Sequence, residues 1–203
     1  MIKKKTMKNI CVFCGSSMGT DLLYREKALE LADYLINNDM RLIYGGADVG
    51  LMKVLADRML EAGKEVIGIM PGHLVANEVA HNELTELIIV ESMAERKDKL
   101  ISLSDVFIAL PGGFGTLDEL AEVLVLDQLR VVEKPMGLLN VKGYFNHLVH
   151  YFDVGVAEGF IRKEHLDNLM IAETAEDLMK KLGEYKPVEM KKWLKDIKTE
   201  SKW

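Results

Sequence analysis

The chain has 203 residues, 49% of them hydrophobic, with a formal net charge of −6 and a pI near 5.5. This length and composition suit one α/β domain with a full-sized core. The acidic balance argues against general affinity for nucleic acid, which needs a basic face. No apolar stretch approaches the roughly 20 residues that span a bilayer, so a membrane is not an expected partner either.

Short apolar runs alternate with segments of helical period, which is the pattern of a parallel sheet covered on both faces. In chain order, strands are predicted at residues 10–13, 41–44, 66–70, 87–90, 106–110 and 136–139, with an edge strand at 169–172. Helices are predicted at residues 21–36, 51–60, 117–129, 145–156 and 175–182, and a further helix ends at Ser102 after the segment 93–97. The pattern predicts a doubly wound α/β sheet in a single domain, residues 1–186.

Residues 187–203 form a lysine-rich tail with Met190, Trp193, Leu194 and Ile197 at helical spacing. Such a stripe is typical of an amphipathic helix, which either docks on the domain or frays.

The first residues and the cysteines indicate a cellular compartment. The lysines within residues 3–8 run directly into a strand-like segment, with no apolar region or cleavage site of a secretory signal. We therefore expect a leaderless cytoplasmic protein. Cys11 and Cys14 have the spacing of redox and zinc sites, but they lie in an apolar strand and no nearby Cys or His completes a zinc site. They are interpreted as small buried hydrophobes.

Glycine or small polar residues follow four of the predicted strands, in the segments 15–19, 45–50, 71–72 and 111–115. The carboxyl ends of parallel strands meet at one edge of a sheet, where ligands bind, so these loops are expected to converge on one pocket. Gly15, Ser16, Gly45 and Gly46 are accordingly candidate substrate-binding residues.

The segment Pro-Gly-Gly-Phe-Gly-Thr-Leu-Asp-Glu at residues 111–119 carries the strongest chemical signal. Bare glycine backbone followed by a helix start favours a bound anion such as phosphate. A carboxylate as close as Glu119 would repel that anion, and this energetic cost indicates that the carboxylate has a chemical role. The alternative is a capping box, in which Thr116 caps the helix and Glu119 reaches back to it.

Arg96 and Lys97 precede the strand that leads into this motif, so Arg96 is a candidate phosphate clamp at the same edge of the sheet. The alternative is a surface arginine paired with a nearby glutamate.

Other catalytic patterns are weak. The five histidines lack metal-site spacing, and no Gly-x-Ser-x-Gly elbow is present. The loop 45–50 lacks the Lys and Ser or Thr that triphosphate hydrolysis needs. No metal is predicted.

The motif at 111–119, read with residues 93–97, resembles the "lonely guy" (LOG) family of cytokinin riboside 5′-monophosphate phosphoribohydrolases. Similar segments stand at residues 14–17, 44–46, 49–52, 68–71, 128–129 and 155–161. Related sequences are often labelled lysine decarboxylases, yet no pyridoxal site is suggested here.

The resemblance implies a Rossmann-like homodimer that hydrolyses the N-glycosidic bond of AMP or an N6-modified AMP, without metal or organic cofactor. It implies Arg96 and Glu119 as the catalytic pair. The implied substrate contacts are Glu78, Arg96, Lys97, Gly112, Gly113, Phe114, Gly115, Thr116, Leu117 and Asp118.

Two departures from the family pattern leave the specificity for the base open. Ala94 stands where the family commonly has His, and Leu126-Asp127 replaces a segment that frequently contains an aromatic residue.

The expected chemistry is stabilisation of positive charge that develops on the ribose as the bond breaks. Glu119 is expected to be ionised because it lies near a helix start, and Arg96 would bind phosphate or steady the ribose. Two rivals remain: a carrier or sensor of nucleotide or molybdenum cofactor without turnover, and a broader nucleoside-monophosphate nucleosidase.

Overall fold

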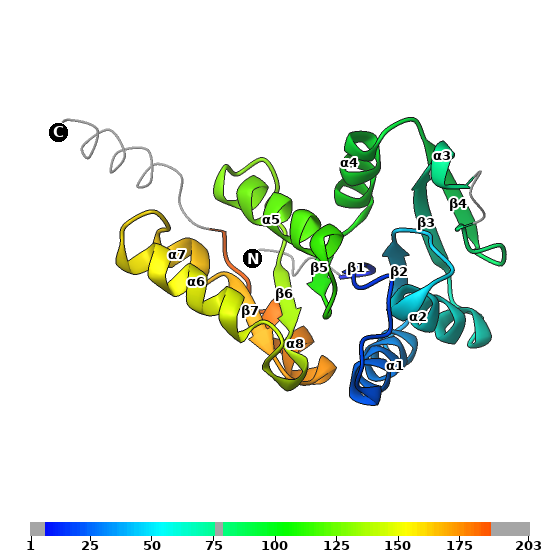
Figure 1. Cartoon of the computed structure of the whole chain (residues 1–203), viewed down its shortest axis with the longest axis horizontal. Helices are drawn as coiled ribbons and strands as arrows, with labels where there is room; N and C mark the ends of the chain where they lie inside the picture. The colour runs from blue at the N-terminus through cyan, green and yellow to red at the C-terminus, as the bar shows by residue number, and fades with distance from the viewer. Residues whose placement is uncertain (1–6, 76–78, 188–203) are drawn as a thin grey trace, which may run out of the picture.

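The computed structural model describes residues 7–75 and 79–187 of the chain. Its centre is a seven-stranded sheet in the order β4-β3-β2-β1-β5-β6-β7, with every neighbouring pair parallel (Figure 1). The strands are β1 (Asn9–Phe13), β2 (Arg41–Tyr44), β3 (Val66–Pro71), β4 (Glu86–Val90), β5 (Val106–Ala109), β6 (Met136–Leu139) and β7 (Leu169–Ala172).

The helices connect these strands. They are α1 (Leu22–Asn37), α2 (Gly50–Glu61), α3 (Gly72–Val75), α4 (Met93–Leu103), α5 (Phe114–Gln128), the 3₁₀ turn η1 (Val141–Gly143), α6 (Asn146–Ala157), α7 (Lys163–Leu166) and α8 (Ala175–Leu182).

Alternating side chains of the central strands fill two separate core layers. In β1, Ile10 and Val12 belong to the layer that packs against α1, α2 and α8, while Cys11 and Phe13 belong to the layer under α4, α5 and α6. Both faces are therefore covered, which explains why the strands read as continuous apolar runs. Within the described residues, none of the helices combines the length and apolar character needed to traverse a bilayer.

The predicted doubly wound parallel sheet is confirmed, and each predicted strand lies within one residue of the observed bounds. Two local predictions are wrong. The α5 helix begins at Phe114 rather than at residue 117, and Arg96 lies inside α4 rather than ahead of it. The short elements α3, η1 and α7 were not predicted because so few residues carry no periodic signal. Apart from residue 187, the tail lies outside the described residues, so the division at 186/187 stays a prediction.

The strand order reverses between β1 and β5, which are neighbours at the centre of the sheet. The loops after these two strands are joined, because the Gly15 N–H donates to the Pro111 carbonyl at 3.1 Å. Such a reversal opens a crevice at the carboxyl edge of a parallel sheet, where ligands characteristically bind. The topology thus directs attention to the loops that begin at residues 14 and 110.

Candidate active site

A cavity of about 200 Å³ lies in this crevice. Its lining brings together seven of the predicted binding residues with the predicted catalytic pair: Gly15, Ser16, Gly45, Gly113, Phe114, Gly115 and Thr116, with Arg96 and Glu119. They come from the loops after β1, β2 and β5 and from α4 and α5. The loop at residues 71–72 does not line the cavity, so three of the four predicted loops converge here.

A buried ion pair crosses the cavity. The Nη1 atom of Arg96 donates to Oε1 of Glu119 at 2.8 Å, and the two side chains are only 13% and 10% exposed. The Nε atom of Arg96 donates to the Ile69 carbonyl at 3.1 Å, so the guanidinium is held from two sides. A pair this buried is not a surface arginine with a nearby glutamate, and that alternative is wrong.

The helix that carries Glu119 starts too early for a capping box. Gly113 is the N-cap of α5, and its carbonyl accepts the Leu117 N–H at 3.1 Å. Thr116 is therefore already in the first turn, and Glu119 is in the second. The Glu119 carboxylate contacts Arg96 instead of the helix start, so the capping interpretation is wrong and the side chain is available for chemistry.

Burial is the largest influence on Glu119 and raises the pKa of its carboxyl group, while the charge and hydrogen bond of Arg96 oppose that rise. The helix dipole acts most strongly in the first turn, and Glu119 lies beyond it. The expectation that the helix start would govern its ionisation is therefore incomplete. Arg96 is the main group that favours the carboxylate, with a smaller contribution from the charge of Lys97.

Gly45 leaves the space that the guanidinium occupies. A Cβ atom at this position would lie 2.2 Å from Nη2 of Arg96, well inside van der Waals contact. The glycine of the β2 loop therefore has a specific function: it lets the arginine from α4 reach Glu119 on α5.

The remaining predicted binding residues lie outside this cavity lining. Lys97 pairs with Asp118 at 3.2 Å and with Glu122 at 2.9 Å, beside the predicted catalytic pair but between α4 and α5. Gly46, Gly112 and Leu117 are near neighbours of lining residues without lining the cavity themselves. Glu78 lies outside the described residues.

Comparison with known proteins places this geometry in a family. Residues 52–182 match the family model described as "Possible lysine decarboxylase". Cytokinin riboside 5′-monophosphate phosphoribohydrolase LOG3 of Arabidopsis thaliana is 42% identical over 186 residues, covering 92% of this chain and 86% of the relative. LOG5 of the same plant is 44% identical over 187 residues, covering 92% and 82%. The chain belongs to the LOG family.

Solved structures share the fold of this LOG-family chain. The molybdenum cofactor binding protein of Rippkaea orientalis has a TM-score of 0.64 at 22% identity, covering 87% of this chain and 95% of that one. The molybdenum cofactor carrier protein of Chlamydomonas reinhardtii also has a TM-score of 0.64, at 21% identity over 86% and 95% of the two chains. Likeness at this identity supports the Rossmann-like fold alone.

Cys14 and Met52 line the cavity but were not among the predicted site residues. Cys14 directly follows β1 at the carboxyl edge of the sheet, and that position was the available signal. Cys11 and Cys14 are both buried free thiols, as predicted, and burial raises the pKa of each. Neither thiol is therefore poised as a nucleophile in this LOG-family site.

A separate polar cluster lies beside the loop after β2. Asp48, Asp57 and His81 bring three candidate metal-ligand atoms within 4.8 Å of one another. Lys53 forms ion pairs with both carboxylates, and His81 contacts Asp57 through Nε2 at 2.9 Å. Its Nδ1 accepts the Glu83 N–H at 3.2 Å. Through these contacts the cluster links α2 to the chain before β4, which is a structural role.

Proposed function

We propose that this LOG-family protein hydrolyses the N-glycosidic bond of AMP or an N6-modified AMP, releasing the free base and ribose 5-phosphate. The observation that carries the proposal is the buried Arg96–Glu119 pair in a cavity walled by the glycine motif. The relatives LOG3 and LOG5 are named for this reaction on cytokinin riboside 5′-monophosphates.

In this reaction the bond from the base nitrogen to ribose C1′ breaks, and its electron pair leaves with the base. Water supplies the new oxygen on C1′, and the base ends with a proton. Positive charge builds on the ribose as the bond lengthens, so an ionised Glu119 stabilises the transition state more than the bound substrate. Arg96 holds that carboxylate ionised and in place.

The phosphate of the nucleotide is assigned to the start of α5. Gly113, Phe114 and Gly115 line the cavity there and present backbone N–H groups at the positive end of the helix dipole. An anion held at this point would lie at the first turn of α5, one turn before Glu119. The ion pair with Arg96 offsets the repulsion between phosphate and carboxylate.

The proposal is tested by incubating the purified protein with AMP and with isopentenyladenosine monophosphate, and measuring free base and ribose 5-phosphate by chromatography. Release of both products in equal amounts is expected. Faster release from the modified nucleotide indicates cytokinin activation, whereas similar rates across purine and pyrimidine monophosphates indicate a broader nucleosidase. Saturable binding of intact nucleotide without products would overturn the hydrolase proposal in favour of a carrier or sensor.

Loss of activity in acid should occur at a higher pH than an exposed glutamate would give. Burial raises the pKa of Glu119, so on acidification the proton binds earlier than at the ordinary value near 4.3. We expect kcat/KM to fall as pH drops through that raised pKa, because the protonated acid no longer stabilises the cationic ribose. A profile that stays level down to about pH 4.3 would contradict the assignment of Glu119 as the essential carboxylate.

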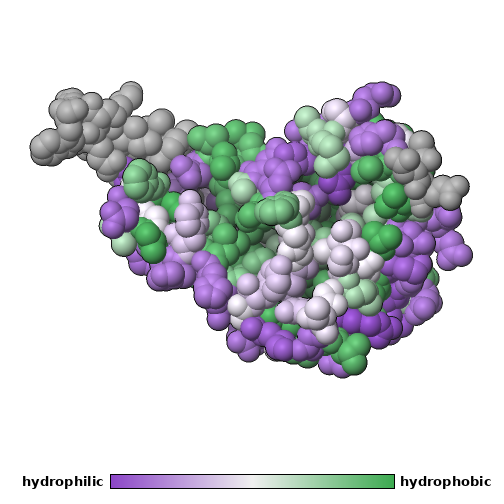
Figure 2. Space-filling model, viewed as in Figure 1, coloured by the Kyte–Doolittle hydropathy of each residue, from purple (hydrophilic) through white to green (hydrophobic). Residues whose placement is uncertain are grey.

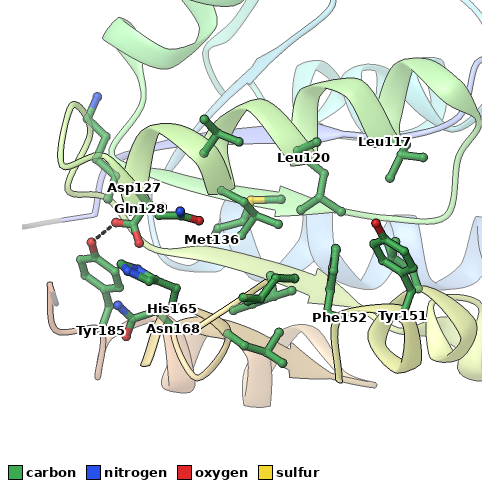
Figure 3. A pocket seen from close by; sticks show the side chains of 18 residues that line it. Leu117, Leu120, Asp127, Gln128, Met136, Tyr151, Phe152, His165, Asn168 and Tyr185 are labelled. Atoms are coloured by element: carbon green, nitrogen blue, oxygen red, sulfur yellow. Dashed lines mark hydrogen bonds between the residues drawn. The ribbon is translucent and has the colours of Figure 1, made fainter. Parts of the chain in front are cut away.

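We also propose that the protein forms the homodimer that the family resemblance implies. A groove of about 640 Å³ lies between α5 and α6, and hydrophobic side chains gather over this region (Figure 2). Leu120, Met136 and Phe152 line its middle, Leu117 lies at one end, and Asp127, hydrogen-bonded to Tyr185, lies at the other (Figure 3). The lining continues through Leu117 towards Phe114, which is 92% exposed in the glycine motif.

Exposed apolar patches of this kind mark interaction sites. A second copy of the chain is the occupant we propose, and sedimentation equilibrium tests it: a monomer at micromolar concentration would contradict the proposal. Location in the cytoplasm stays a prediction from the sequence.

A further inference from the structure

The loop after β6 reaches the glycine motif through one side chain. The hydroxyl group of Tyr144 donates to the carbonyl of Gly112 at 2.6 Å. Tyr144 is 46% exposed and borders a hollow of about 360 Å³ whose lining also includes Gly112, Gly113 and Phe114. Burial in the core does not explain the direction of its hydroxyl group, because the residue is exposed to this extent.

The loop is built to hold Tyr144 in this orientation. The buried side chain of Asn140 accepts the Phe145 N–H at 2.8 Å and donates to Asn146 at 2.8 Å. Lys142 adopts a left-handed φ of 55°, which a residue with a side chain rarely does, and pairs with Asp21 at the start of α1. Strained backbone held by its surroundings in this way is characteristic of functional positions.

Two neighbouring rings also fix the Tyr144 ring. Its centroid lies 6.0 Å from that of Tyr24 and 5.2 Å from that of Phe145, both in edge-on contact. The direction of the hydroxyl group is thus set by packing on two sides as well as by the loop.

The acceptor belongs to a peptide unit that has no side chain on either flank. Gly112 and Gly113 lack Cβ atoms, so the plane of the peptide between them can rotate more freely than any other in the motif. The position of Gly112 has no room for a side chain, because a Cβ there would lie 2.1 Å from Oγ1 of Thr116. In a trans peptide the carbonyl and the following N–H point in opposite directions. Holding the Gly112 carbonyl towards Tyr144 therefore directs the Gly113 N–H away from Tyr144.

We propose that Tyr144 is a positioning residue, which holds the Gly112–Gly113 peptide so that the Gly113 N–H faces the phosphate of the nucleotide. This inference rests on the proposed function. Gly113 lines the catalytic cavity and is the N-cap of α5, so its N–H lies at the start of the helix to which the phosphate is assigned. Tyr144 itself does not line that cavity and acts through the glycine backbone.

The test is Tyr144→Phe, which removes the hydroxyl group and keeps the ring. Ribose 5-phosphate binding, measured by calorimetry, is expected to weaken by about 3- to 10-fold, the usual value of one hydrogen bond. The KM for AMP should rise by a similar factor while kcat stays within about twofold, since the phosphate is held equally in the ground and transition states. The affinity for adenosine, which has no phosphate, should not change.

Tyr34→Phe is the matched control, because Tyr34 lies in the last turn of α1, which leads into the start of β2 at the amino edge of the sheet, opposite the carboxyl-edge loops. It should leave all of these quantities unchanged. Unaltered ribose 5-phosphate affinity in Tyr144→Phe would overturn the proposal, as would equal losses for ribose 5-phosphate and adenosine, which indicate a general structural role. A fall in kcat at constant KM would overturn it as well.

Failure of the hydrolase proposal can be distinguished from failure of the role proposed for Tyr144. If the unaltered protein binds ribose 5-phosphate but releases no base from AMP, the hydrolase proposal fails while the effect of Tyr144→Phe on phosphate affinity can still be observed. If AMP is hydrolysed equally by both proteins with the same KM, only the role of Tyr144 fails.

Discussion

Glu119→Gln is expected to lower kcat by roughly 10³-fold and to leave the dissociation constant for AMP within a few-fold. Glutamine is nearly isosteric, and its amide oxygen can still accept the Arg96 hydrogen bond that the carboxylate accepts at 2.8 Å. What disappears is the negative charge, which stabilises the developing cation only in the transition state. Single-turnover rates and calorimetric titration of AMP measure the two quantities separately.

Glu95→Gln provides the control for Glu119→Gln. Glu95 adjoins Arg96 in α4 and likewise carries one negative charge, but its carboxylate accepts the Glu91 N–H at 2.9 Å instead of the arginine. Its removal should change kcat little. Equal losses of turnover and affinity in Glu119→Gln would make Glu119 a binding residue, and retained turnover would exclude it from the chemistry.

Gly45→Ala is expected to lower kcat/KM by roughly 10²-fold with little change in the melting temperature. The added Cβ would lie 2.2 Å from Nη2 of Arg96, so the guanidinium must move. The displaced atoms are the far end of a flexible side chain, which makes the shift cheap for stability. A displacement of about 1 Å in a catalytic group commonly costs this much in rate. Steady-state kinetics and thermal unfolding together provide the measurement.

Gly72→Ala is the matched control for this substitution. A Cβ at Gly72 meets only Ile89 at 3.6 Å, an ordinary contact, and the residue does not line the cavity that holds Arg96 and Glu119. Its activity should equal that of the unaltered protein. If Gly45→Ala keeps full activity, the position of Arg96 seen here is not the one required for turnover. If Gly45→Ala unfolds at a much lower temperature, the clash is relieved through the backbone rather than through the arginine.

The prediction of the fold from sequence succeeded because both faces of the sheet are covered. Residues such as Ile10 and Cys11 pack into opposite core layers, so every position of the central strands must be apolar and the strands stand out as continuous runs. The bounds of α5 were harder to predict. A threonine three residues before a glutamate is a standard helix start, yet the helix begins at Phe114, directly after Gly113, because tertiary packing of the motif overrides the local preference.

The candidate site was predicted as a set of residues and not as an arrangement. The family resemblance named Arg96 and Glu119 as a catalytic pair, but not their ion pair, which joins two helices across 23 positions of sequence. Their burial, and with it the raised pKa of Glu119, depends on what surrounds them. Tyr144 escaped notice because a single aromatic residue in a turn carries no local pattern.

Hydrophobic periodicity and missing side chains are local properties of the chain, so the class of the sheet, the glycine loops at its carboxyl edge and the residue types available there could be predicted from the sequence. Which loops meet depends on the fold, since the strand order places β1 beside β5 although nearly 100 residues separate them. The fold also lets Gly45 make room for Arg96, Arg96 hold Glu119, and Tyr144 hold Gly112. Contacts of this kind depend on long-range packing, which no short window of sequence contains.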